Sequence, residues 1–72
     1  MEKTELIQFF AEFWRIDPSK VNDNLRLDDK NLTDHSSMRI YQFFAKVESK
    51  FKVKIRNLSK ILTFGDLFTN LG

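Results

Sequence analysis

The sequence predicts an all-α fold, a small up-and-down four-helix bundle formed by one domain over residues 1–72. Two observations predict it. Apolar residues recur at three- and four-residue spacing in three segments, and the one alternating segment is too short and has no partner with which to build a sheet. Of the 72 residues, 42% are hydrophobic, with eight Phe and one Trp, so we expect aromatic rings to supply the core.

The first helix is expected over residues 4–16, where apolar side chains repeat at helical spacing, with Thr4 as its cap and Asp17-Pro18 as its end. Residues 17–36 are rich in Asn, Asp and Lys and have no sustained period. We therefore expect a long loop between the first and second helices. Four apolar residues should pin it to the core: Val21, Leu25, Leu27 and Leu32.

The second helix, residues 37–51, has the clearest period. Its apolar stripe comprises Ile40, Phe43, Phe44, Val47 and Phe51. Ser36 is expected to cap this helix through its hydroxyl group. The reciprocal partner of a capping box is missing, because position 39 is Arg and not Glu.

The rest of the chain is predicted to hold one short and one longer helical segment. Residues 52–55 alternate like a strand, and we interpret them as an extended connector whose Val53 and Ile55 pack inward. Residues 57–62 form at most a short helical turn. Thr63 then caps a last helix over residues 64–71.

Composition argues against catalysis, metal binding and membrane insertion. The chain has no cysteine and one histidine, His35, so it offers no thiol nucleophile and no second imidazole for a metal cluster. No nucleophile-elbow or oxyanion-loop motif surrounds the neighbouring serines. The longest apolar runs are far shorter than the roughly 18 residues that cross a bilayer. Residues 1–5 do not resemble a signal peptide, so we expect a cytoplasmic protein. Because the catalytic groups named above are missing, we expect that it is not an enzyme.

Charge is divided unevenly along the chain. Residues 1–36 contain five basic and eight acidic side chains, a net charge of −3, whereas residues 37–72 contain seven basic and two acidic side chains, a net charge of +5. We therefore expect an acidic and a basic face. A charge of +5 over 36 residues is modest, so nucleic-acid binding is not the favoured interpretation.

The segment around residues 34–38 is the most informative for function, because two hydroxyl groups stand where the polar loop meets the second helix. The N–H groups and the positive dipole end at a helix start favour an anion there. The negative charge of a phosphodiester on Ser37 would therefore be stabilised at this position. Arg39 and His35 would add to that field.

The ordered motifs from residue 16 onward resemble the acyl carrier protein family. Residues 37–55 are similar to the family's Asp-Ser-Leu followed by an amphipathic helix that ends Leu-Glu-x-x-Phe-x-Ile-x-Ile. Residues 62–67 resemble its Ile-Thr-Thr-Val-Gly-Asp-Leu opening of the last helix, and residues 16–21 its Val-Asp-Pro-x-x-Ile after the first. The resemblance spans nearly the whole chain.

The resemblance implies an acyl-carrier-like fold in which Ser37 bears a covalent 4'-phosphopantetheine arm that holds an acyl group as a thioester. It also implies a monomer whose partners are a phosphopantetheinyl transferase, an acyl-loading ligase or acyltransferase, and ketosynthase-type enzymes. Partner-binding residues would be Ser36, Met38, Arg39, Tyr41, Gln42 and Ala45. For Met38 and Tyr41 the alternative is ordinary packing in or beside the core.

The chain departs from the family pattern at the attachment site and in charge. Ser36 stands where the family has Asp, and Leu32-Thr33 where it has Leu-Gly, with one extra residue before Ser37. The exposed positions of the second helix include Arg39, Lys46 and Lys50, whereas the family presents an acidic helix. We therefore expect a specialised carrier that serves dedicated enzymes of a fatty-acid, polyketide or polyene-type pathway.

Two alternatives stay open at this point. The first is an aminoacyl or peptidyl carrier, because the loading enzyme chooses the cargo. The second is an unmodified helical adaptor or nucleic-acid-binding module that has kept the fold without the arm. Ser36 in place of Asp and the basic helix are the features that favour the second alternative.

Overall fold

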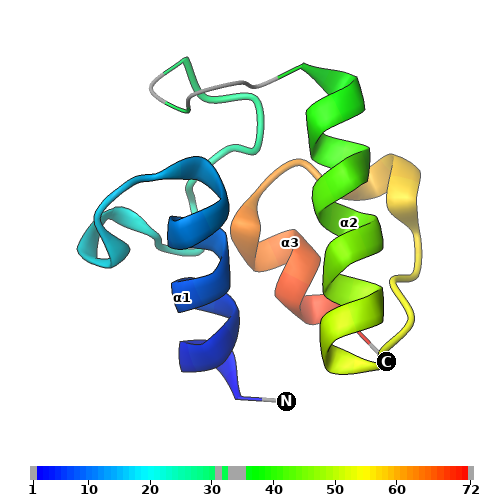
Figure 1. Ribbon diagram of the computed structural model, residues 1–72. Coiled ribbons are helices and arrows are strands. Elements are labelled where there is room, and N and C mark those ends of the chain that lie inside the picture. Colours follow the sequence, from blue (N-terminus) through cyan, green and yellow to red (C-terminus); the bar gives the residue numbers. More distant parts are fainter. Residues whose placement is uncertain (1, 31, 33–35, 72) are drawn as a thin grey trace.

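The computed structural model describes residues 2–30, 32 and 36–71. In chain order its helical elements are α1 (Lys3–Trp14), the 3-10 turn η1 (Pro18–Lys20), α2 (Ser37–Phe51), the 3-10 turn η2 (Leu58–Lys60) and α3 (Phe64–Thr69) (Figure 1). The described residues contain no strand and only two isolated antiparallel bridges. The all-α class is therefore confirmed in this part of the chain. A four-helix bundle is not confirmed, because η2 is a single three-residue turn.

The two long helices run in opposite directions, with α3 seen between them in Figure 1. After α1 the chain turns back, and η1 lies beside this helix. The connector that follows α2 runs back beside that helix and leads through η2 into α3. None of the described helices combines the length and the apolar character needed to span a bilayer.

Aromatic rings are the largest side chains of the core, which aliphatic residues complete. Phe10, Trp14, Phe43 and Phe64 are all fully buried. Phe10 of α1 meets Phe43 of α2 at a ring-centroid distance of 5.3 Å and Phe64 of α3 at 5.4 Å, both edge to face. One side chain thus joins all three helices in the T-shaped geometry that aromatic pairs prefer.

Helix α1 begins one residue before the expected start and ends two residues before the expected end. Its N-cap is Glu2, which makes no side-chain cap hydrogen bond, so the expectation of Thr4 as the cap is wrong. Arg15 adopts the left-handed conformation (φ 57°, ψ 50°), and the N–H of Ile16 turns back to the Ala11 carbonyl at 3.0 Å. A left-handed residue stops the helix before the Asp-Pro signal can act.

The long loop is pinned to the core as expected, but it is not structureless. Val21, Leu27 and Leu32 are buried, and Leu25 is half-buried. The loop contains η1, whose start is capped by the Asp17 carboxylate accepting from the Ser19 N–H at 2.9 Å. Backbone hydrogen bonds attach it to the chain before α3, from Leu27 N–H to the Leu62 carbonyl at 3.0 Å and from Phe64 N–H to the Leu25 carbonyl at 2.8 Å.

The connector after α2 packs as predicted, whereas the last helix is shorter than predicted. Ile55 is buried and Val53 is half-buried. Helix α3 ends at Thr69 and not at residue 71, because Leu71 forms a bridge with Ile55 and the Asn70 carbonyl accepts from the Arg56 N–H at 2.9 Å. The last residues therefore pair with the connector instead of extending the helix.

Candidate functional site

Ser37 is the first residue of α2, and it is exposed. The Ser36 hydroxyl oxygen accepts a hydrogen bond from the Arg39 N–H at 3.3 Å, and the Ser36 carbonyl accepts from the Ile40 N–H at 3.0 Å. The predicted N-cap is thus confirmed. Because Ser36 serves as the cap, Ser37 can present its hydroxyl group to solvent without weakening the helix start.

The start of α2 favours a negatively charged group. The helix is 15 residues long, and its first turn contains no acidic side chain. The partial positive charge of the helix N-terminus is therefore not neutralised by a carboxylate of that turn. His35, which the sequence suggested as a further contributor to this field, lies outside the described residues.

Arg39 is half-buried and contacts α1. Its guanidinium carbon lies 3.8 Å from the centroid of the Phe13 ring. Its Nη2 donates to the Phe13 carbonyl oxygen at 3.4 Å, and its Nη1 donates to Gln42 Oε1 at 3.4 Å. A cation over an aromatic face is stabilising, and Phe13 O belongs to the last turn of α1, whose carbonyls need donors from outside the helix.

This contact changes how two predicted partner residues are understood. Gln42 accepts from Arg39 within α2, and Arg39 joins the end of α1 to the start of α2, near Ser37. Sequence reasoning missed the contact because 26 residues separate Arg39 from Phe13 and no local pattern connects them. In the structure Arg39 is a positioning residue that keeps the two helices together at the Ser37 end.

The predicted apolar partner patch faces solvent. Met38 is 73% exposed and Tyr41 is 54% exposed, so neither is a core residue. The Tyr41 ring packs edge to face on Phe44 at 5.7 Å, which fixes its base while leaving half of it accessible. Ala45 is exposed on the same stripe. Exposed Met and Tyr side chains are typical of protein interfaces.

Two more large apolar side chains, Leu58 and Leu62, are 41% and 54% exposed. Leu58 is the first residue of η2 and Leu62 lies two residues after its end, and neither was singled out from the sequence as a surface residue. The signal that could have found them is that residues 57–62 are predicted as a short helical turn, where few side chains can be buried. Their exposure adds apolar surface on the segment between the connector and α3.

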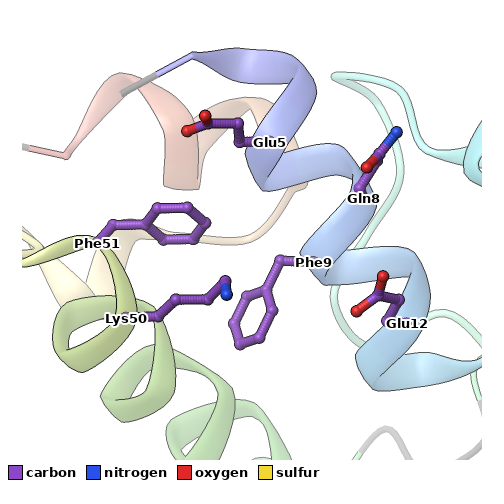
Figure 2. Close-up of a pocket in the computed structure, with 6 residues that line it drawn as sticks. All are labelled: Glu5, Gln8, Phe9, Glu12, Lys50 and Phe51. Carbon is purple, nitrogen blue, oxygen red and sulfur yellow. The ribbon is translucent and has the colours of Figure 1, made fainter.

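An open groove of about 350 Å³ lies between α1 and the end of α2 (Figure 2). Its lining residues are Glu5, Gln8, Phe9, Glu12, Lys50 and Phe51. The Lys50 ammonium group lies 5.5 Å from the centroid of Phe9 and 5.8 Å from that of Phe51, so the protein's own cation already covers both rings. Lys50 follows Ser37 by 13 residues, roughly 20 Å along the helix, so this groove is at the opposite end of α2.

A second cavity, of about 610 Å³, lies beneath the loop that leads towards α2. It is lined by Arg15, Ile16, Asp17, Lys20, Leu25, Asp29 and Leu32. Its volume lies in the range of small-molecule sites, and Leu32 precedes Ser37 by five residues. Charged groups of both signs surround it, so no single ligand charge is favoured.

Two carboxylates, Asp17 and Asp66, have pKa values lowered by hydrogen bonds from the backbone. The pKa of Asp17 is lowered chiefly by the backbone N–H of Ser19, and the pKa of Asp66 chiefly by the backbone N–H of Leu62. Both carboxylates are therefore engaged at the start of a helical element. No group of three or more metal-ligating side chains occurs within residues 2–30, 32 and 36–71.

Comparison with known proteins adds no relative to this picture. No protein-family model, no curated protein and no solved structure matches the chain.

Proposed function

We propose that this protein is an acyl carrier protein that bears a 4'-phosphopantetheine arm on Ser37. The observation that supports the proposal is the placement of Ser37: an exposed hydroxyl group at the first position of the longest helix, next to a separate serine that performs the capping. The exposed Met38 and Tyr41 beside it provide an apolar surface on which an enzyme can dock.

The residues at the start of α2 suit the attachment of a phosphodiester. In the transfer, the Ser37 hydroxyl oxygen attacks the pantetheine-bearing phosphorus of coenzyme A and loses its proton. The bond from this phosphorus to the bridging oxygen breaks, and adenosine 3',5'-bisphosphate leaves. The remaining phosphodiester bears one negative charge at the positive end of a helix that has no carboxylate in its first turn. When bound, the arm supplies the thiol that the polypeptide lacks.

The architecture is compatible with a carrier fold in which η2 takes the place of a short third helix. Three α-helices surround an aromatic core, and the loop before α2 is pinned by buried leucines. The proposed cargo is a thioester-linked acyl group, and the chain would serve a specialised pathway because the exposed side of α2 is basic at Lys46 and Lys50. The proposed setting is the cytoplasm, and the proposed state is a monomer.

The test is intact-mass measurement after co-expression with a phosphopantetheinyl transferase from the same organism. The wild-type chain and Ser36→Ala are expected to gain the mass of phosphopantetheine, and Ser37→Ala is expected to gain nothing. Peptide mapping should place the group on residue 37. Absence of the mass from wild type, or its presence on Ser37→Ala, would contradict the proposal.

The same preparation separates the alternatives. A modified protein that a ligase loads with an amino acid instead of an acyl chain would be an aminoacyl carrier. An unmodified protein whose affinity for DNA or RNA falls steeply with salt would be a nucleic-acid-binding module.

A further inference from the structure

The connector after α2 lies beside the helix face that holds the exposed apolar residues. Glu48 is seven residues after Tyr41, which places both on one stripe of α2, about 10 Å apart along the axis. The Glu48 Oε2 accepts a hydrogen bond from the Ile55 N–H at 3.0 Å. The connector is thereby fastened to the same side of α2 as Tyr41. We call this side the α2 face; Ser37 lies at one end of it and the connector at the other.

Two cations of the connector point away from the core at this end of the face. Ile55 is buried and its neighbours Lys54 and Arg56 are exposed. The bridge from Ile55 to Leu71 and the hydrogen bond from Arg56 N–H to the Asn70 carbonyl hold the backbone extended. Side chains two residues apart in an extended segment point the same way, about 6.6 Å apart.

No carboxylate compensates these cations within the described part of the chain. The basic half contains two acidic residues, Glu48 and Asp66. Glu48 is engaged by the Ile55 N–H, and Asp66 by the N–H groups of Leu62 and Thr63 at 3.1 Å each. The ion pairs found among the described residues are Lys3–Asp23 and Arg26–Asp28, both in the other half.

The combination of apolar and cationic side chains indicates a folded protein as the occupant. Met38 and Tyr41 supply the apolar centre of an interface, and Lys54 and Arg56 supply a charged rim. Phosphate contacts use cationic and polar groups and would leave the 73% exposed Met38 without a partner, so a protein surface fits the combination better than a nucleic acid. An enzyme that acts on Ser37 approaches the start of α2, where Met38 and Tyr41 are exposed.

We infer that the enzymes that modify and load this carrier dock on the α2 face through Met38 and Tyr41 and place an acidic patch against Lys54 and Arg56. The inference rests on the proposed function and specifies the partner. Glu48, which holds the connector, follows Ser37 by eleven residues, or about 17 Å along α2. The partner's acidic patch would therefore lie about 17 Å from the site where the partner reacts with Ser37. Complementary charge at that distance accelerates encounter and orients the carrier.

The test measures the rate of Ser37 modification by the phosphopantetheinyl transferase of the same organism. The double variant K54E/R56E should lower kcat/KM about 10-fold at low salt with kcat little changed, because charge acts on encounter. The matched control K20E/K30E makes the same change in net charge on exposed lysines of the α1–α2 loop and should stay within about twofold of wild type. Raising salt should slow wild type and leave K54E/R56E little affected.

Each other outcome has a definite meaning. Equal rates for wild type and K54E/R56E would overturn the inference and leave the carrier proposal standing, because Ser37 would still be modified. An equal loss of kcat/KM in K20E/K30E would show that the net charge of the protein acts, and not Lys54 and Arg56 in particular. This result would also overturn the inference. Tight binding of a dT12 oligonucleotide that K54E/R56E abolishes would assign the cations to nucleic acid. A wild-type chain that is never modified would remove both proposals. Circular dichroism melts verify that both double variants fold.

Discussion

The starts of α2 and α3 have the same capping chemistry and opposite surroundings. A hydroxyl group caps each helix: Ser36 accepts from the Arg39 N–H at 3.3 Å, and Thr63 accepts from the Asp66 N–H at 3.1 Å. At α3 the Asp66 carboxylate completes a capping box, and α2 has Arg39 at the equivalent position, turned towards α1. A capping box places a carboxylate at the helix start, and its absence leaves α2 able to attract an external anion.

The two helices differ in burial at the same positions. The first residue of α3, Phe64, is fully buried, and the first residue of α2, Ser37, is exposed. The second residue of α3, Gly65, lies against Asp23, and the second residue of α2, Met38, is 73% exposed. The start of α3 is thus packed into the fold, and the start of α2 is exposed to solvent. The comparison can be tested position by position.

The largest difference is expected at the first helical position. Phe64→Ala removes a ring that packs on Phe10 and should destabilise the fold by about 3–5 kcal/mol. Ser37→Ala should change stability by less than about 0.5 kcal/mol, because an exposed hydroxyl group is lost. Urea unfolding of both variants measures the difference. A cost for Ser37→Ala similar to that for Phe64→Ala would show that Ser37 is a structural residue.

The second position should give a smaller contrast. In Gly65→Ala the new Cβ would lie 2.9 Å from both the Cβ and the carbonyl oxygen of Asp23, so backbone must move. We expect a loss of about 1–3 kcal/mol, although alanine ordinarily stabilises a helix relative to glycine. Met38→Ala should be close to neutral. Thermal melts measure both, and a stabilised Gly65→Ala would contradict the close approach.

At the cap position the two helices should behave alike. Ser36→Ala and Thr63→Ala each remove one hydroxyl acceptor at a helix start and should each cost about 1 kcal/mol. Amide hydrogen exchange localises the effect: Arg39 N–H should exchange faster in the first variant and Asp66 N–H in the second. Unchanged exchange at Arg39 would mean that Ser36 does not cap α2.

The third position should give the smallest effect, seen as a pH dependence. The backbone N–H of Leu62 holds the pKa of Asp66 below its ordinary value of 3.8. A lowered pKa in the folded state means that the carboxylate stabilises the fold above that ordinary value and that this contribution is lost as pH falls through the lowered pKa. Melting temperature should therefore drop below about pH 4, and Asp66→Asn should flatten part of that drop. Because the pKa of Asp17 is also lowered, some acid sensitivity should persist in the variant.

Much of the fold follows from local pattern. The bounds of α2, the caps Ser36 and Thr63 and the inward packing of Ile55 were all predicted correctly, because each depends on residues within a turn or two of one another. The ends of α1 and α3 were not. In α1 the left-handed Arg15 ended the helix early, and in α3 the pairing of Leu71 with Ile55 competed with helix extension.

The candidate site divides in the same way. The exposure of Ser37, Met38 and Tyr41 follows from the period of α2, because a core stripe on one face leaves the opposite face in solvent. The roles of Arg39 and Glu48 do not follow from it. Arg39 stacks on Phe13, and Glu48 accepts from the Ile55 N–H, each through a partner on another segment.

By itself, the sequence determined where α2 begins and ends, which hydroxyl group caps it and roughly where α1 and α3 lie. Only the tertiary structure decided that Arg39 joins α1 to α2, that both carboxylates of the basic half are engaged by backbone N–H groups, and that Glu48 of α2 holds the connector at Ile55, between the exposed Lys54 and Arg56. The physical reason is range. Capping and periodicity act within a turn, whereas ion pairing, stacking and surface charge depend on which distant segments folding brings together.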